Sequence, residues 1–373
     1  MGAWVIGRTV SDRFIWSQYL AWIPTVLALP LAFVVLVLSS AVALMDEGAD
    51  RLTPYARDRR RRARRIATGL RAIGWVGVAW MAWTLVASEL NLGAKRVREA
   101  GPVGRVDSFT LVYWNLANWP SERATELVRV QKPTLAVLAN VGYDLDREVL
   151  REKVGGDAEL LEAGPFTLVA ATPIVSWGIT SLGFKGTRLN SEGESEAERI
   201  DPGRAMWIAL DVGRVEGGVG GEARPLVVWI LDLPSDVTLS RRAIAESTRR
   251  QLVAWQGTVF RRVPDDAEGT GRYRADTTLA MTGFPEPDVI VGDFNIPRGC
   301  WSLGVVTTGP GWTTRGAFEQ AGLGYAATWP LKMPLWHIDQ TFLAPWLCAT
   351  KYRVVNPRTG LHWMQVVEFG AAE

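Results

Sequence analysis

Hydrophobic residues fill two long runs in the first ninety residues of the chain. Tyr19–Met45 is interrupted only by one threonine, two serines and two prolines, and Ala72–Leu90 carries a single charged residue. A membrane-spanning helix needs about 20 predominantly apolar residues and tolerates proline. The pattern therefore predicts two transmembrane helices, at about residues 19–45 and 72–90. The alternative for the first run, a cleaved signal peptide ending near Ala41-Val42-Ala43, requires a shorter apolar core and no second span.

Arginine dominates the polar segment between the two runs. Asp46–Arg71 contains RDRRRRARR from Arg57 to Arg65. Such a run also fits nucleic-acid binding, but between two apolar spans it is typical of a cytoplasmic loop under the positive-inside rule. We therefore expect a multi-pass protein of the plasma (inner) membrane. Residues 1–98 form its anchor, and everything after Asn91 faces the extracytoplasmic side.

From Phe109 onward the pattern changes to short apolar runs separated by polar segments, which is typical of an α/β domain. The expected strands are Phe109–Tyr113, Leu135–Leu138, Thr167–Ala171, Gly178–Phe184, Met206–Val212, Leu226–Leu233, Val289–Gly292, Ile338–Leu343 and Gln365–Phe369. The expected helices are Ser121–Val130 with Ser121 as N-cap, Leu239–Phe260, and a short one near Gly316–Ala321. Connections are expected at residues 91–107, Lys185–Arg204, Glu216–Pro225 and Arg261–Pro287. Strands with interspersed helices over roughly 265 residues predict one two-sheet domain at residues 99–373.

Composition and charge narrow the function classes. The 18 tryptophans favour an apolar or membrane-interfacial surface. Two cysteines, Cys300 and Cys348, exclude a disulfide framework and a cysteine-based zinc site, and two unpaired thiols are the commoner arrangement. Two histidines, His337 and His362, exclude a histidine-rich metal centre. The first 100 residues hold 14 basic and 7 acidic side chains of the chain's 41 and 39, so the remainder carries 27 and 32 and is net negative. That balance disfavours a non-specific nucleic-acid binder.

The segment VIVGDFNIPRG, Val289–Gly299, carries the first candidate chemistry. A short apolar strand delivers Asp293 and Asn295 to its C-terminal end, where sites on α/β sheets usually lie. A carboxylate and an amide oxygen suit a hard divalent cation or a positioned water. A strand followed by an Asx turn is the simpler alternative.

Four separated motifs extend this pattern. Tyr113-Trp114-Asn115, then GDFN, then Trp336-His337-Ile338-Asp339, then His362 before a final VVEF strand occur in that order. In motif order and spacing the chain resembles the endonuclease/exonuclease/phosphatase superfamily over about Val106–Phe369, and within it the subgroup anchored by N-terminal transmembrane helices. The resemblance implies a four-layer α/β sandwich, with two packed mixed β-sheets flanked by helices and the site at one edge.

The resemblance also implies roles for five residues. Asn115 contacts the scissile phosphate or a metal-bound water, Asp293 orients the attacking water or holds the metal, and Asn295 contacts the phosphate. His362 stabilises the charge that develops on phosphorus or transfers a proton. Asp339 accepts the other ring proton of that histidine and fixes its tautomer. His337 is expected to be structural.

The chain departs from the family pattern at three positions. Asn140 stands where the family has its main metal-binding glutamate, Asp232 where it has a histidine, and Leu361 where it has an aspartate. An amide contributes an oxygen but no charge, so Mg²⁺ or Mn²⁺ bound by Asn140 and Asp293 is expected to be held weakly. The acidic residues that could compensate are Asp144, Asp146 and Asp232.

Three functions remain open from the sequence. The first is a membrane-tethered, metal-dependent phosphodiesterase or phosphomonoesterase. The second is a catalytically impaired relative that binds a phosphorylated ligand, a lipid headgroup or a protein partner. The third is a structural protein of the membrane surface. A net-negative domain on a lipid bilayer favours a phosphorylated small molecule or lipid over nucleic acid as substrate, and the oligomeric state stays open.

Overall fold

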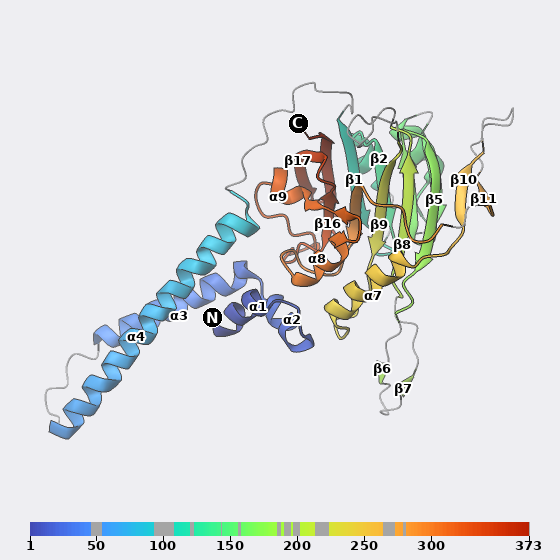
Figure 1. Cartoon of the computed structure of the whole chain (residues 1–373). Helices are drawn as coiled ribbons and strands as arrows, with labels where there is room; N and C mark the ends of the chain where they lie inside the picture. Colours follow the sequence, from blue (N-terminus) through green and yellow to red (C-terminus); the bar gives the residue numbers. More distant parts are fainter. Residues whose placement is uncertain are drawn as a thin grey trace. The chain divides into compact units, whose positions relative to one another are not determined.

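The computed structural model of the chain divides into two compact units, Met1–Gly93 and Ala94–Glu373 (Figure 1). The predicted boundary at residue 98 lies outside the described residues. Those residues are 1–45, 54–92, 108–119, 123–142, 144–155, 158–184, 188–189, 195–196, 202–212, 224–263, 273–278 and 281–372.

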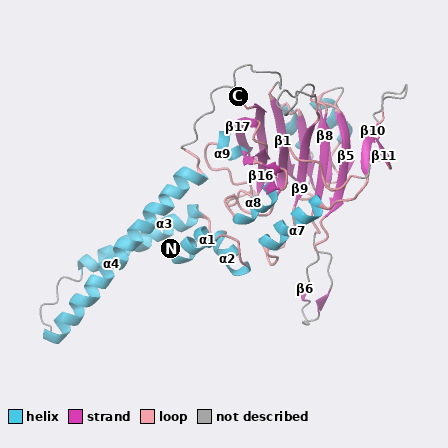
Figure 2. Cartoon of the chain, in the orientation of Figure 1, coloured by secondary structure: helices cyan, strands magenta, loops and turns pink. Residues whose placement is uncertain are grey.

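The described part of the N-terminal unit is entirely helical (Figure 2). Its elements are α1 (Gly2–Val10), α2 (Ile15–Ala21), α3 (Thr25–Met45), α4 (Pro54–Thr84) and the π-helical turn η2 (Leu85–Glu89) that continues α4. Thr25–Val42 and Arg61–Glu89 are long and apolar enough to cross a membrane. The two predicted apolar helices are therefore confirmed as helices.

Their bounds differ from the prediction. The first was expected from about residue 19, but the chain breaks between α2 and α3, where Pro24 lacks a backbone donor. The arginine-rich segment was expected to be a loop. Residues 46–53 lie outside the described part, and from Pro54 the segment is already helix α4, because proline is favoured in the first turn and arginine and alanine are good helix formers. Helices α1 and α2 were not predicted.

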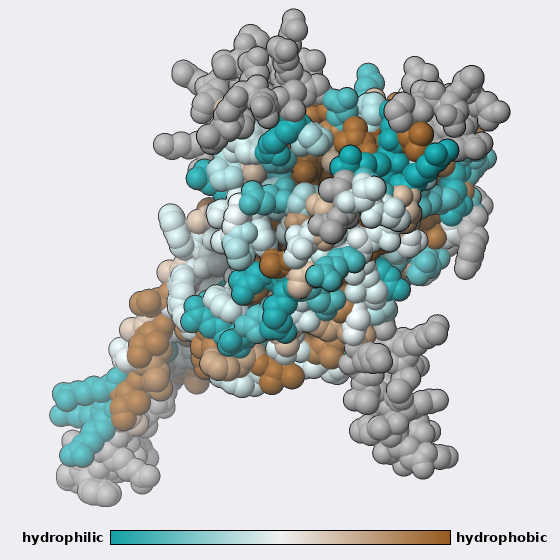
Figure 3. All heavy atoms as spheres, turned by 45° about the vertical axis from the view of Figure 1, so that its right-hand side comes forward, coloured by the Kyte–Doolittle hydropathy of each residue, from teal (hydrophilic) through white to brown (hydrophobic). Residues whose placement is uncertain are grey.

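The N-terminal unit turns apolar residues outward. Phe14 and Trp16 stack on each other and are 52% and 54% exposed, whereas Asp12 and Gln18 are fully buried. Figure 3 shows hydrophobic residues over much of the visible side of this helical unit, with hydrophilic residues gathered toward one end. This arrangement is the reverse of that in water-soluble proteins, in which large apolar side chains are normally buried.

The second unit contains two mixed β-sheets in its described part. The six-stranded sheet has the order β17-β18-β1-β2-β4-β3, and the eight-stranded sheet has the order β11-β10-β5-β8-β9-β12-β16-β15. The first consists of β1 (Phe109–Asn115), β2 (Leu135–Ala139), β3 (Glu159–Ala163), β4 (Phe166–Ala170), β17 (Leu347–Val355) and β18 (Met364–Ala371). The second consists of β5 (Ile174–Ser181), β8 (Arg204–Leu210), β9 (Leu226–Asp232), β10 (Val259–Arg262), β11 (Tyr273–Asp276), β12 (Val289–Asp293), β15 (Arg315–Gly316) and β16 (Asp339–Leu343). Two short pairs complete the strands: β6 (Arg188–Leu189) with β7 (Ser195–Glu196), and β13 (Thr308–Gly309) with β14 (Trp312–Thr313).

The main core lies between the two sheets. Leu111 and Val137 of the first sheet share it with Ile230 and Val291 of the second. A second cluster packs the other face of the six-stranded sheet against helices that include α5 (Ala124–Val130) and α6 (Arg147–Val154). Trp207 of β8 makes an edge-to-face contact with Trp255, which follows α7 (Arg241–Val253), and Trp229 of β9 makes one with Phe284. The remaining helices are α8 (Trp301–Thr307) and α9 (Ala317–Ala321). The fold is the predicted α/β sandwich of two packed mixed sheets flanked by helices.

Local differences from the prediction follow from tertiary pairing. The helix expected over Leu239–Phe260 ends at Val253, because Val259–Arg262 instead pairs with β5 as strand β10. The connection expected at Arg261–Pro287 contains strand β11. Helix α5 begins at Ala124, and the expected N-cap Ser121 lies outside the described residues, as do the hairpin at residues 216–223 and most of the loop at 185–204. Elements α6, α8, β3 and β17 were not predicted.

Candidate active site

Three carboxylates meet at one edge of the eight-stranded sheet. Asp232 ends β9, Asp293 ends the parallel strand β12, and Asp339 begins the antiparallel strand β16. The strand registers place Asp293 opposite both other aspartates. Side chains alternate along a strand, so each aspartate continues the row of inward-facing residues that builds the core. All three are buried.

Three nitrogen donors meet them from the six-stranded sheet. Asn115 ends β1, Asn140 follows the parallel strand β2, and His362 precedes the antiparallel strand β18. Pairing of β1 with β2 and with β18 brings these three residues to the same edge of that sheet.

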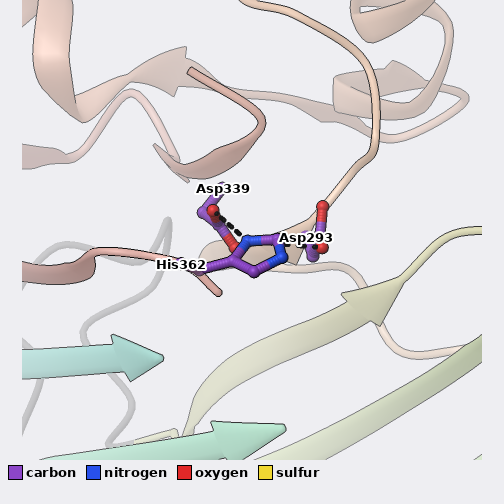
Figure 4. A group of neighbouring side chains, drawn as sticks. All are labelled: Asp293, Asp339 and His362. Atoms are coloured by element: carbon purple, nitrogen blue, oxygen red, sulfur yellow. Dashed lines mark hydrogen bonds and ion pairs between the residues drawn. The ribbon is translucent and has the colours of Figure 1, made fainter. Parts of the chain in front are cut away.

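Each donor binds one carboxylate across the gap between the sheets. Asn115 Nδ2 donates to Asp293 Oδ2 at 2.9 Å, and Asn140 Nδ2 donates to Asp232 Oδ2 at 3.0 Å. His362 Nδ1 and Asp339 Oδ2 are 2.9 Å apart, and the same nitrogen lies 3.8 Å from Asp293 Oδ2 (Figure 4). The site is thus a row of cross-sheet pairs, with donors from one sheet and acceptors from the other.

Further hydrogen bonds hold Asp293 in one position. Its Oδ1 accepts from the Asn295 backbone N–H at 2.9 Å, so the Asx turn that was an alternative interpretation is also present. Its backbone N–H donates to Tyr113 Oη at 2.9 Å. Asn295 has a φ of 49° and anchors its Nδ2 on the Leu233 carbonyl at 2.8 Å. Both oxygens of Asp293 are therefore oriented by backbone and side-chain donors.

Electrostatics separate the two central titrating groups. Burial raises the pKa of Asp293 to about 6, and the Asp339 carboxylate adds to this effect while His362, the Asn295 N–H and Asn115 oppose it. Burial alone would lower the pKa of His362, but the Asp339 and Asp293 carboxylates together raise it to about 9. At neutral pH the site therefore pairs an ionised aspartate with an imidazolium.

Other candidates lie elsewhere. His337 is buried in the core with Nε2 2.7 Å from Tyr352 Oη, and burial lowers its pKa well below the ordinary value, in keeping with the structural role expected for it. Asp146 caps helix α6 by accepting from the Val149 N–H, and Leu361 is exposed. Neither Cys300 nor Cys348 forms a disulfide.

Two residues of the site were given no role from the sequence, although Tyr113 belongs to one of the four motifs. Tyr113 binds the Asp293 backbone, and the Thr328 hydroxyl accepts from the Asp339 N–H at 3.2 Å. The alternation of side chains along a strand was the available signal for Tyr113, since it lies two residues before Asn115 on the same face. Nothing in the local sequence marks Thr328.

The donor set fits a divalent cation in ligand chemistry. Atoms of Asp293, Asp339 and His362 lie within 4.8 Å of one another. His362 Nδ1 and Asp339 form an ion pair with each other, so they are less available to a cation. The part of the site better suited to a cation contains Asp232, Asp293 and the Asn115 amide oxygen. Asp232 and Asp293 offer carboxylate oxygens and Asn115 an amide oxygen, the ligand types that a hard divalent cation prefers.

No family model matches the chain, and no curated protein matches it either. Solved structures do. An endonuclease/exonuclease/phosphatase from Bacteroides vulgatus aligns with 71% of this chain and 100% of its own, at 12% identity and a TM-score of 0.45. A family protein of the same description from Bacteroides thetaiotaomicron aligns over 70% and 98%, at 14% identity and a TM-score of 0.45. A mannosyl-6-phosphatase from Bacteroides thetaiotaomicron aligns over 70% and 99%, at 13% identity and a TM-score of 0.43.

Proposed function

We propose that the second unit is a metal-dependent phosphoesterase of the endonuclease/exonuclease/phosphatase superfamily, hydrolysing a phosphodiester or phosphomonoester. The observation that carries this proposal is the His362–Asp339 pair beside Asp293. It places an imidazolium and a carboxylate of near-neutral pKa together, oriented by fixed hydrogen bonds. Groups whose pKa values are driven apart in one site are suited to acid and base roles.

In this proposal Asp293 takes the proton of the attacking water. Its pKa of about 6 leaves it ionised yet basic at neutral pH. Asn115 and the Asn295 N–H fix the direction of its two oxygens. His362 stays protonated, and because Asp339 engages Nδ1, its Nε2–H serves the negative charge that builds on the phosphoryl oxygens or on the leaving group. Asn295 would contact the phosphate through the part of its side-chain amide that does not bind the Leu233 carbonyl.

Mg²⁺ or Mn²⁺ would be held by Asp232 and Asp293 with amide oxygens of Asn115 and Asn140. When bound, the cation would neutralise part of the negative charge of the phosphate. Only two of these ligands are carboxylates, so affinity is expected to be modest.

We place this domain on the extracytoplasmic side of the inner membrane, tethered by α3 and α4. The outward-facing apolar residues of the first unit and its buried Asp12 and Gln18 support insertion into lipid, where exposed apolar side chains incur no cost. The exposed arginines at the start of the second apolar helix support a cytoplasmic position for that end. Arg62→Cys should resist an impermeant thiol reagent in intact cells and react once the membrane is opened, with wild type as the background. Equal labelling in both states would refute this orientation.

The substrate that fits best is a phosphorylated lipid or small molecule. Exposed apolar side chains stand on three of the loops at the strand ends that carry the site: Trp119 after β1, Val237 after β9 and Leu361 before β18. These side chains suit an apolar substituent on the phosphate ester, and the net-negative charge of the chain beyond residue 100 disfavours a long polyanion.

A catalytically impaired binding protein is the second candidate, favoured by Asn140 and Leu361 in place of acidic residues. The test is hydrolysis of an aryl phosphodiester and an aryl phosphomonoester by the full chain in detergent micelles with Mg²⁺ or Mn²⁺. We expect activity that Asp293→Ala abolishes and Glu246→Gln, on the outer surface of α7, leaves unchanged. An inactive wild type that stays inactive after Asn140→Glu with Leu361→Asp would favour the binding protein instead.

A further inference from the structure

Asn140 occupies a constrained position at the end of β2. Its φ is 50°, in the left-handed region that asparagine tolerates better than most residues. Its backbone is held on both sides, because its N–H donates to the Pro165 carbonyl at 2.8 Å and its carbonyl accepts from the Asn118 N–H at 2.7 Å. The side chain therefore leaves the strand in a fixed direction, toward the other sheet.

The amide nitrogen of Asn140 bridges two oxygens. It donates to Asn115 Oδ1 at 3.1 Å and to Asp232 Oδ2 at 3.0 Å. Asn115 has its own nitrogen committed to Asp293, so the group that it turns toward Asn140 is its oxygen. With acceptors on both sides, Asn140 must present its NH₂ group rather than its oxygen. A partial positive charge thus lies between two oxygens that come from different sheets.

These two oxygens belong to the set that a divalent cation would bind. We propose that Asn140 is a built-in substitute for the cation: its NH₂ links Asn115 to Asp232 when no cation is present. When a cation arrives, the amide turns by half a rotation about its terminal bond and offers its oxygen as a ligand. This inference rests on the proposed function only for the kind of cation, Mg²⁺ or Mn²⁺.

Two consequences follow. The fold keeps both sheets joined at the site without a cation, since each of the three carboxylates has a nitrogen donor of its own. Cation affinity is reduced, because binding has to break two hydrogen bonds of Asn140, each of which lowers affinity by about fivefold to tenfold.

The experiment compares thermal unfolding of the full chain in detergent micelles with EDTA, Mg²⁺ or Mn²⁺, for wild type, Asn140→Asp and Asn140→Ala. Wild type should melt within about 1 °C in EDTA and in millimolar Mg²⁺. Asn140→Asp should melt lower in EDTA, because a carboxylate replaces the donor facing Asp232, and should rise by about 5 °C or more with either cation. Asn140→Ala is the matched control: it also loses the donor but adds no ligand, so a cation should raise its lowered melting temperature by clearly less than that of Asn140→Asp.

Two results would overturn the proposal. One is a wild type that loses stability in EDTA as strongly as Asn140→Asp, which would show that a cation and not the amide joins the sheets. The other is Asn140→Asp melting like wild type in EDTA, which would show that the amide bridge contributes nothing. Neither readout uses hydrolysis, so an inactive enzyme would refute the proposed function and leave these outcomes intact.

Discussion

The two units of this chain bury opposite kinds of residue. In the second unit the interior is apolar, with side chains such as Val137 and Ile230 fully buried between the sheets. In the first unit Asp12 and Gln18 are fully buried, while Phe14 and Trp16 are more than half exposed. Apolar surface is costly in water and costs nothing in hydrocarbon, where polar groups have to find partners inside the protein. The difference supports the proposal that the first unit lies in lipid and the second in water.

Buried polar groups serve different ends in the two units. In the first unit Arg8 pairs with Glu89, and the Thr25 hydroxyl accepts from Arg8 at 2.8 Å and from Trp4 at 3.1 Å. That cluster joins α1, the start of α3 and the end of η2. In the second unit the buried polar row gathers at one edge, where it joins the sheets and leaves titratable groups in place for chemistry. Both clusters join secondary elements, and in the second the pKa of Asp293 is raised to about 6 and that of His362 to about 9.

The largest effect is expected from the chain's two buried histidines. His362→Gln should reduce hydrolysis per folded molecule by about 1,000-fold, because a neutral amide cannot supply the imidazolium charge or proton. It should also lower the melting temperature, because Asp339 loses its charged partner. His337→Gln should also lower the melting temperature, but hydrolysis per folded molecule should stay within about twofold. Kinetics well below both melting temperatures, together with thermal unfolding, make the comparison. Equal losses of activity in both variants would contradict the separation of site from core.

The next prediction tests directly whether the two units lie in different solvents. Val35 in α3 and Val130 in α5 are 56% and 59% exposed, so they differ mainly in what surrounds them. In membranes, Val35→Cys should react with a water-soluble maleimide about 100-fold more slowly than Val130→Cys, since the thiolate that reacts does not form in hydrocarbon. Both should react equally in denaturing detergent, and wild type gives the background of the native cysteines. Fast labelling of Val35→Cys in membranes would show that α3 does not lie in the bilayer.

A smaller effect is expected from removing either of two arginine–glutamate salt bridges, one in each unit. Glu89→Gln should cost about 1–3 kcal/mol, because Arg8 then loses the negative charge of its ion-pair partner in a largely buried setting. Glu246→Gln removes an exposed pair with Arg242 and should cost less than about 0.5 kcal/mol. Hydrogen exchange of α1 and α7 amides gives a local readout, with exchange in α1 faster by roughly tenfold or more in Glu89→Gln. Unchanged exchange in α1 would show that Arg8 does not depend on Glu89.

Much of this arrangement was accessible from the sequence. Strand ends at Asn115 and Asp293 follow from short apolar runs that stop at a polar residue, and the motif order placed Asp339 and His362 with them. The apolar length of α3 was equally clear. Each of these features depends on local pattern or on motif order, which a single sequence records.

The remainder depends on partners distant in sequence. Asn140 was identified as a weak ligand, but its bridge between Asn115 and Asp232 arises only once the two sheets pack in register. Strand β10 forms at the end of a predicted helix because β5 offers it a partner. Helices α1 and α2 are short, and α2 carries its polar residues inward, so the usual outward-polar helical pattern does not reveal it.

The smallest effect is the pH dependence of the site. Activity should rise about tenfold per pH unit up to about pH 6, as Asp293 loses its proton, and stay level to about pH 9. Above that it should fall as His362 becomes neutral. Stability follows the same groups. The pKa of His362 is raised in the folded state, so its contribution is fully present below the ordinary value of 6.5 and is lost as pH rises through about 9. The pKa of Asp293 is also raised, so its contribution is present below 3.8 and is lost as pH rises through about 6.

Asp339→Asn tests which group sets each limb of the pH–activity profile, His362 the alkaline limb and Asp293 the acid limb. It removes the carboxylate beside Nδ1 while burial of the ring remains, so the pKa of His362 should fall and the alkaline limb should move to lower pH. The acid limb should move down too, but less, because Asp339 is the second cause of the raised pKa of Asp293, after burial. Glu246→Gln should leave both limbs in place. An alkaline limb that stays near pH 9 in Asp339→Asn would mean that it reports a group other than His362, and the acid and base roles assigned to this edge of the sandwich would then have to be exchanged or abandoned.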